Sequence, residues 1–149
     1  MTSVQIIEYY NMKPLPKEGG YFCEGQRNGC ISSTILYLIT KDSFSRMHKL
    51  PKEEVYHFYM GDPVEQLQLL PDGTGKVIRL GQDVLCGEYI QYTAPADCWH
   101  GTRLADGGEW ALMGATLAPA WDDSDYTDGA REELILRWPG FEKEILRRT

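Results

Sequence analysis

The sequence lacks several features that identify common classes of protein. Among its 149 residues there are only three histidines and four cysteines, and no two cysteines have the two-residue spacing of a zinc knuckle or a redox dithiol. Basic residues are also scarce, because 15 lysines and arginines face 22 acidic residues and leave a net charge of −7. This balance argues against a nucleic-acid partner, since proteins that bind nucleic acid carry basic patches.

Long apolar segments are absent as well. The longest apolar run covers residues 35–39 and is far too short to span a bilayer, so we expect no membrane partner. Residues 1–10 contain no basic region followed by an apolar stretch, so no secretory signal is predicted and the expected location is cytoplasmic. In that compartment the cysteines are expected to be buried thiols; they are Cys23, Cys30, Cys86 and Cys98.

The chain does contain a series of short strand patterns, and its length fits one domain over residues 1–149. Segments rich in β-branched and aromatic residues follow one another at intervals of about ten residues, separated by turn signals such as Pro71-Asp72-Gly73. The predicted strands are 33–40, 45–50, 54–60, 64–70, 76–80, 89–93, 98–104 and 110–117. This spacing predicts a β-sandwich or barrel, and no segment between the strands is long enough for the crossover helix of a parallel sheet.

The two ends of the chain have helical patterns instead. Residues 3–11 place apolar side chains at helical spacing, and Thr2 or Ser3 can cap the helix. Residues 129–149 also have a helical pattern, which is broken at Pro139-Gly140. We therefore expect short helices at both ends of an otherwise all-β chain.

The candidate functional residues are His48, Glu54 and His100. A histidine at one strand end, a carboxylate after a short loop and a second histidine on a later strand can converge inside a small barrel. Two imidazoles and one carboxylate suit a divalent transition metal and leave positions open for water or substrate. The alternative is a polar cluster at the barrel mouth that holds only water.

At these residues the chain resembles the cupin superfamily. The first cupin motif has a histidine, a second histidine two residues later, then a glutamate and a glycine. His48, Glu54 and Gly61 match it, whereas Leu50 occupies the position of the second histidine. The resemblance therefore implies three metal ligands where the family has four.

The second cupin motif is matched only in part. Pro95 and His100 have the expected spacing, but Asp97 replaces a glycine and Leu104 replaces an asparagine. Because Leu50 supplies no ligand, a divalent ion such as Fe, Mn, Ni or Zn is expected to bind weakly. Its occupancy should fall as the pH drops through about 6.5, the ordinary pKa of an imidazole.

A wider resemblance covers nearly the whole chain. Residues 18–22, 33–38, 44–48, 54–63 and 118–119 look like those of a group of short cupins of unknown function. The group is similar in fold to the deoxysugar epimerases, which implies a double-stranded β-helix, or jelly roll. Superfamily members usually cover their exposed strand edges by pairing, so we expect a homodimer.

Strand alternation predicts which neighbours of Glu54 face the cavity. Tyr56 and Phe58 lie two and four residues after Glu54 and should line the pocket with it. His57 should point to the opposite side of the sheet, and only a bulge would turn it inward. A ligand role for His57 is therefore disfavoured.

The same alternation suggests three further pocket residues. Arg46 shares a face with His48, where it could bind a carboxylate or phosphate or remain a solvated surface charge. Cys98 shares a face with His100 and could line the cavity. Gln68 is a candidate for the pocket wall, with the outer face as the alternative.

Three functions are compatible with these residues. The first is a metal-assisted isomerase or epimerase acting on a sugar or keto acid, in which His100 or Glu54, if unligated, moves a proton next to a carbonyl. The second is a non-haem iron oxygenase, because two histidines and one carboxylate form its ligand set. The third is a non-catalytic module that binds a small molecule, since one fold serves many functions.

Overall fold

A computed structural model describes residues 1–149, and most of the regular structure is β. The strands are β1 (Lys13–Pro14), β2 (Tyr21–Asn28), β3 (Ser32–Thr40), β4 (Ser45–Lys49), β5 (Glu54–Gly61), β6 (Val64–Leu69), β7 (Gly75–Leu80), β8 (Gln91–Ala94), β9 (Trp99–Leu104), β10 (Trp110–Leu117) and β11 (Thr127–Asp128). The α-helices are α1 (Ser3–Tyr10), α2 (Arg131–Arg137) and α3 (Glu142–Leu146). Short 3-10 turns are η1 (Val84–Cys86), η2 (Asp123–Asp125) and η3 (Pro139–Phe141).

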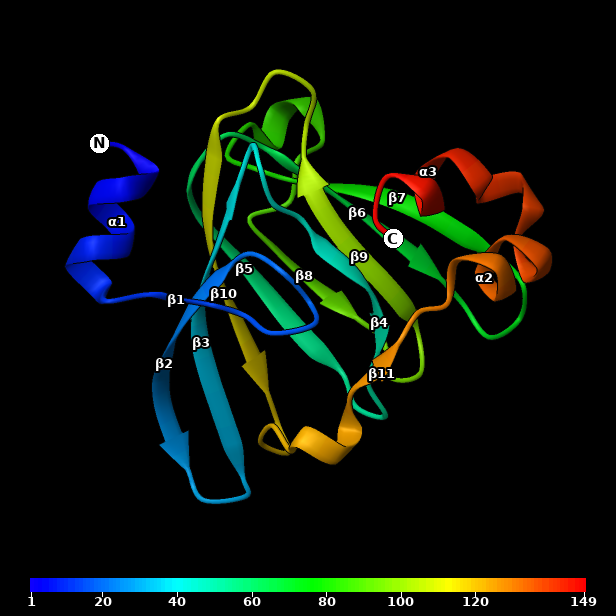
Figure 1. Ribbon diagram of the computed structural model, residues 1–149, viewed down its shortest axis with the longest axis horizontal. Helices are drawn as coiled ribbons and strands as arrows, with labels where there is room; N and C mark the ends of the chain where they lie inside the picture. The colour runs from blue at the N-terminus through cyan, green and yellow to red at the C-terminus, as the bar shows by residue number, and fades with distance from the viewer.

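The strands form two antiparallel sheets that face each other, and Figure 1 shows one on each side of the molecule. The six-stranded sheet has the order β1-β2-β3-β10-β5-β8, and the five-stranded sheet has the order β11-β4-β9-β6-β7. Several pairs of neighbouring strands, such as β3 and β10 or β4 and β9, are far apart in sequence, so the chain passes repeatedly between the sheets. The predicted all-β jelly roll with short terminal helices is confirmed.

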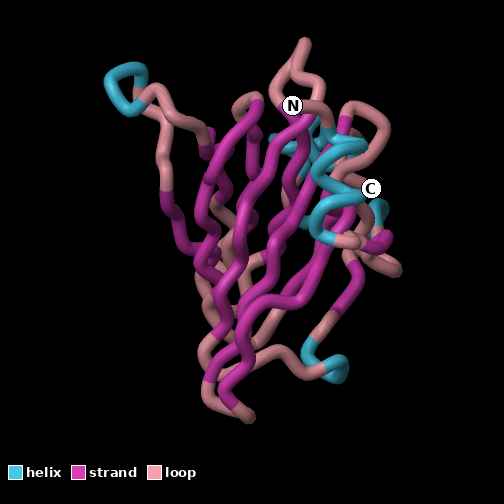
Figure 2. Tube along the Cα trace, turned by 90° about the vertical axis from the view of Figure 1, so that its left-hand side faces the viewer, coloured by secondary structure: helices cyan, strands magenta, loops and turns pink.

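The predicted strands are present with bounds that differ by at most two residues. The turn at Pro71-Asp72-Gly73 joins β6 and β7 in the expected hairpin, in which Val64 pairs with Leu80. Strand β2 was not predicted, because most of its side chains are polar and exposed. The long strands of the barrel are seen side by side in Figure 2.

The terminal helices cover the outer faces of the two sheets (Figure 1). The side chain of Thr2 accepts a hydrogen bond from the backbone of Gln5 and begins α1, as the sequence predicts. Ile6 of this helix packs on Leu38 and Leu112 of the six-stranded sheet. Helices α2 and α3 cover the five-stranded sheet; their buried side chains are Leu134, Trp138 and Ile145.

Between the sheets lies a cluster of 12 buried apolar residues. It includes Ile39, Phe58, Val64, Leu80 and Met113, which come from both sheets. Burial of such side chains contributes about 1.5–3 kcal/mol each and holds the sheets together. One end of the barrel interior is therefore filled.

The cysteines differ from expectation. All four are free, but only Cys98 is buried; Cys23 is half-buried, and Cys30 and Cys86 are exposed. Cys30 follows the end of β2 and Cys86 lies in η1, where loops leave side chains in solvent. No helix of the structure is long and apolar enough to cross a membrane.

Candidate metal centre

Three buried side chains from both sheets meet at one end of the barrel interior, next to Tyr56 of the apolar cluster. His48 on β4 and His100 on β9 lie directly opposite each other in neighbouring strands. Glu54 is the first residue of β5 in the other sheet. The two histidines are each 1% exposed and Glu54 is 7% exposed, so all three are removed from bulk water.

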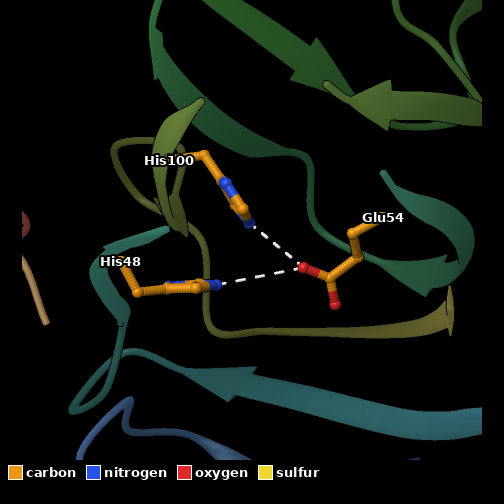
Figure 3. A group of neighbouring side chains, drawn as sticks. All are labelled: His48, Glu54 and His100. Atoms are coloured by element: carbon orange, nitrogen blue, oxygen red, sulfur yellow. Dashed lines mark hydrogen bonds and ion pairs between the residues drawn. The ribbon is translucent and has the colours of Figure 1, made fainter. Parts of the chain in front are cut away.

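Both imidazole rings point at one carboxylate oxygen, as Figure 3 shows. Glu54 Oε2 lies 3.1 Å from His100 Nε2 and 3.9 Å from His48 Nε2. One ligand atom from each residue lies within 4.8 Å of the others. The convergence that the sequence predicts for these three residues is confirmed.

The other ring nitrogens are held by backbone carbonyls. His48 Nδ1 lies 2.7 Å from the carbonyl oxygen of Arg46, and His100 Nδ1 lies 3.1 Å from that of Cys98. Because a carbonyl can only accept, each Nδ1 carries a proton and donates it. Each Nε2 is then the nitrogen that faces Glu54 and that can bind either a proton or a metal, an arrangement typical of metal-binding histidines.

Without a metal, this geometry favours charged groups. Burial disfavours the imidazolium form of His48, but the carboxylates of Glu18 and Glu54 outweigh it and raise the pKa of His48 to about 9. Burial also favours the neutral acid at Glu54, but hydrogen bonds from His100 and His48 outweigh it and lower the pKa of Glu54 to about 2. These pKa values favour a protonated His48 beside an ionised Glu54, with the proton on the Nε2 atom that could otherwise bind a metal.

The three residues fit a transition metal. Metal–N and metal–O bonds of about 2.0–2.2 Å place neighbouring ligand atoms about 3.0–3.5 Å apart. The separation of 3.1 Å between Glu54 Oε2 and His100 Nε2 lies in this range, and the separation of 3.9 Å from His48 Nε2 is somewhat wider. Leu50, which occupies the fourth cupin position, is buried and offers no lone pair. Two imidazoles and one carboxylate are thus the protein ligands available here.

A cavity of about 510 Å³ lies beside this cluster. Glu54 and Tyr56 reach it from β5, and most of its wall comes from β2, β3, β10 and the loops at 15–18 and 121–126. Its aromatic lining residues are Phe22, Tyr37, Tyr56, Trp121 and Tyr126. Such a volume suits a small molecule.

Among the lining residues that were not predicted from the sequence, two interact with residues of β4, the strand that carries His48. Glu18 lines the cavity and accepts a hydrogen bond from Ser45. Tyr126 stacks on His48, with ring centroids 5.4 Å apart and an interplanar angle of 16°. Both residues lie in loops, where no strand alternation exists to predict the direction of a side chain.

The predicted pocket residues differ in their positions. Tyr56 lines the cavity, and its hydroxyl donates to Glu54 Oε2 at 2.9 Å. Phe58 packs in the apolar cluster farther inside the barrel. Gln68 is buried and lies opposite His100 on the neighbouring strand, where its Nε2 donates to Gln66 Oε1 at 2.8 Å.

Cys98 and Arg46 do not line this cavity. The Cys98 thiol is buried and contacts the carbonyl oxygen of Trp99, and burial raises its pKa to about 11. Arg46 is exposed. The pairing of β4 with β9 is irregular between Ser45 and His48, so simple alternation does not hold between Arg46 and His48.

His57 lies outside the cluster. Its Nε2 is 3.0 Å from the hydroxyl oxygen of Thr116 on the adjacent strand, and its ring stacks on Tyr59. Tyr59 is exposed, so this group lies on the outer face of the six-stranded sheet. His57 therefore serves as an internal comparison for the two histidines of the site.

Comparison with known families identifies the class of the protein. The model of the family described as "Cupin superfamily (DUF985)" matches residues 4–128, so the chain belongs to this cupin family. The match includes all three residues of the cluster and most of the cavity wall. No curated protein matches the sequence.

Solved structures agree with this assignment. A hypothetical protein from Leishmania major is 25% identical, with a TM-score of 0.93, and the match covers 100% of this chain and 99% of that one. A protein from Shewanella oneidensis is 20% identical, with a TM-score of 0.93 and coverage of 100% and 98%. A variant of Bacillus subtilis oxalate decarboxylase is 10% identical, with a TM-score of 0.61, and the match covers 93% of this chain and 38% of that one. The last two likenesses establish the fold alone.

Proposed function

We propose that this protein is a metal-dependent cupin enzyme that moves a proton at a carbon next to the carbonyl group of a small sugar or keto acid. One observation carries the proposal: two Nε2 atoms, fixed by their backbone-bonded Nδ1 atoms, converge on a carboxylate at the wall of a cavity. Structural histidines do not need this arrangement, as the single hydrogen bond of His57 illustrates.

His48, Glu54 and His100 would hold the divalent ion, with Fe, Mn, Ni or Zn as candidates. When bound, the ion supplies a Lewis acid that polarises a carbonyl oxygen and makes the adjacent C–H group more acidic. Three protein ligands leave coordination positions for water or a substrate. Because the fourth cupin ligand is replaced by Leu50, we expect weak, exchangeable binding.

The chain's own residues would orient the ligand. The aromatic side chains of the cavity provide flat apolar walls, and Glu54 and Tyr56 connect the cavity to the cluster. A wall of this kind limits the access of water to a bound molecule and strengthens the electrostatic interactions inside. The substrate must be small, because the cavity holds about 510 Å³.

The ligand set also favours a second candidate, a non-haem iron oxygenase. Two histidines and one carboxylate that leave open positions are typical of such enzymes. Iron in the purified protein together with oxygen uptake would favour this candidate. A protein that binds small molecules and no metal would instead be a non-catalytic module.

The test begins with elemental analysis of protein purified without chelator, followed by calorimetric titration with Mn, Fe, Ni and Zn. The loaded protein is then incubated in D2O with D-glucose, D-fructose, dihydroxyacetone or pyruvate. Proton NMR should record loss of the signal from the carbon next to the carbonyl.

His48→Gln and His100→Gln should abolish metal binding and exchange, whereas the matched control His57→Gln should retain both. The control removes an imidazole from the outer face of the same barrel. Metal binding that survives both site variants, or wild-type protein that exchanges no proton in any probe, contradicts the proposal.

We also propose that the protein is a homodimer. Helix α1 packs Ile6 on its own sheet and does not require a second chain. Support comes instead from exposed Tyr59 on the outer face of the six-stranded sheet and from the free edges of β1 and β8. Light scattering should return twice the mass of 17.0 kDa, and a monomer mass at micromolar concentration contradicts the proposal.

A further inference from the structure

The loop between β1 and β2 has an unusual backbone. Lys17 has φ of +65°, and Gly19 and Gly20 have φ values of +97° and +71°. Glycine adopts these left-handed values freely, whereas a lysine does so at a cost. The strained residue is directly followed by Glu18, whose side chain lines the cavity.

Close contacts with β3 and β4 hold this loop in place. The Tyr37 hydroxyl donates to the carbonyl oxygen of Gly19 at 2.8 Å. The backbone N–H of Arg46 donates to the carbonyl oxygen of Glu18, also at 2.8 Å. A Cβ atom on Gly19 would lie 2.4 Å from the carbonyl oxygen of Phe44. These contacts fix the direction in which the Glu18 side chain leaves the loop.

The Glu18 carboxylate is bonded on one side only. Its Oε1 accepts a hydrogen bond from the Ser45 hydroxyl at 2.8 Å, and no other protein donor bonds to the carboxylate. It lines the same cavity as Glu54 but does not belong to the group of three potential ligands. Burial raises its pKa, which makes it a stronger base than an exposed glutamate.

The proposed reaction requires a base that the metal ligands cannot supply. A histidine whose Nε2 binds a metal has no free lone pair for a proton, and a carboxylate bound to a metal is a weaker base than a free one. Among the other residues that line the cavity, Glu24 and Asp123 are exposed, and Asp123 accepts a hydrogen bond from Trp121 Nε1. Glu18 is the remaining carboxylate.

We propose that Glu18 is the catalytic base of this site, an inference that rests on the proposed function. The Glu18 carboxylate takes the proton from the carbon next to the carbonyl. The C–H electron pair becomes a carbon–carbon double bond, and the carbonyl π pair moves to its oxygen. In D2O the acid exchanges its proton with solvent and returns a deuteron to carbon, so that C–H and D2O give C–D and HDO.

The test compares Glu18→Gln, Glu18→Asp and wild type in the exchange assay described above, with the same four probe compounds. Gln retains an oxygen that can accept from Ser45 but cannot take the proton. Removal of a general base costs about 10²–10⁴-fold in rate, so kcat for exchange should fall at least about 100-fold in Glu18→Gln with little change in KM. Glu18→Asp should recover part of this loss. Glu133→Gln, which changes an exposed glutamate on α2, should behave as wild type.

Calorimetric titration with Mn provides a readout that does not depend on turnover. Glu18→Gln should bind Mn within about tenfold of wild type, whereas loss of a true ligand costs more than the ~10–100-fold that follows loss of a residue supporting a ligand. Thermal unfolding checks that each variant is folded.

The outcomes separate the two proposals. Wild-type protein that exchanges no probe overturns the proposed function and the role of Glu18 together. Active wild type with an equally active Glu18→Gln overturns only the role of Glu18. A folded Glu18→Gln that loses Mn binding together with exchange makes Glu18 a metal ligand and overturns its role as base.

Discussion

The two ends of the barrel interior differ, although the same strands build both. Along β6, β9 and β5, the side chains that point inward change from apolar to polar. In order from the apolar end, they are Val64, Gln66 and Gln68 on β6, Leu104, Thr102 and His100 on β9, and Phe58, Tyr56 and Glu54 on β5. The apolar end belongs to the 12-residue cluster, and the polar end carries the candidate metal centre.

This difference shows how the fold accommodates buried polar groups. Burying a polar group is unfavourable unless it is hydrogen-bonded. From the polar end toward the middle of the barrel, Gln68 donates to Gln66, and Gln66 Nε2 donates to the Thr102 hydroxyl at 3.2 Å. The apolar end thus supplies stability, and the middle of the barrel supplies the bonds that fix the polar end.

The largest expected effect is on the free energy of unfolding, and it should follow a substitution at the apolar end. Phe58→Ala removes a ring from the apolar cluster and should lower the free energy of unfolding by about 3–5 kcal/mol. Metal affinity of the folded variant should stay within about threefold, because Phe58 lies outside the ligand group. Urea unfolding measures the free energy of unfolding, and calorimetry measures the metal affinity. A loss of stability below about 1 kcal/mol would contradict the idea that the apolar end supplies most of the stability.

A second substitution tests the polar end, where the expected effect is on metal affinity. Glu54→Gln keeps the shape but removes the negative charge on which both histidines converge, so metal affinity should fall more than about 100-fold. Titration with Mn or Zn measures the loss. Unchanged affinity would mean that the metal, if it binds, does so elsewhere.

Changes in pH also distinguish the two ends, because the histidines and the glutamate that can gain or lose a proton lie at the polar end. His48, whose pKa is raised to about 9 by the nearby carboxylates, must lose its proton before its Nε2 can bind a metal. Metal affinity should therefore rise about tenfold per pH unit up to about pH 9 and fall equally as the pH is lowered. Titrations between pH 7 and 9 test this, and a flat profile above pH 7 would place the His48 pKa near its ordinary value.

Leu50 marks a point where the polar end departs from the cupin motif. Leu50→His should restore a fourth ligand and raise metal affinity about tenfold, equivalent to about 1.4 kcal/mol. Leu50→Met, which has similar volume, is the control and should leave the affinity unchanged. If neither wild type nor Leu50→His binds any of the four metals, the cluster is not a metal site.

The smallest effect is expected at the hydrogen bond between Gln68 and Gln66, which joins the polar end to the middle of the barrel. Gln68→Leu removes the donor to Gln66 Oε1, but it also removes the buried Gln68 Oε1, which has no hydrogen-bond partner. The net cost should be about 1 kcal/mol of unfolding free energy. Chemical denaturation measures this loss. A value above about 3 kcal/mol would mean that Gln68 contributes as much to stability as a residue of the apolar end.

Sequence patterns predicted the strands and the three converging residues because both depend on regular features. Alternation and turn signals mark β3 to β10, and the spacing of His48, Glu54 and His100 carries the cupin resemblance. Strand β2 was not predicted, because only its first three residues are partly buried and its sequence does not alternate between apolar and polar residues.

The rest of the site depends on tertiary structure. Glu18 follows a left-handed lysine in a loop, and only the contacts of that loop with β3 and β4 turn it into the cavity. The position of Arg46 depends on an irregular strand pairing that alternation does not predict. Similarly, Tyr126 meets His48 only because β11 returns to pair with β4.

That late pairing of β11 has a consequence for the order of events during synthesis. β4, which carries His48, lies between β9 and β11, and the backbone N–H of Met47 donates to the carbonyl oxygen of Arg148. Until the last fifth of the chain leaves the ribosome, β4 remains an open edge that other chains can pair with. The stacking of Tyr126 on His48 therefore forms late, after residues 127–128 have been synthesised and have paired with β4.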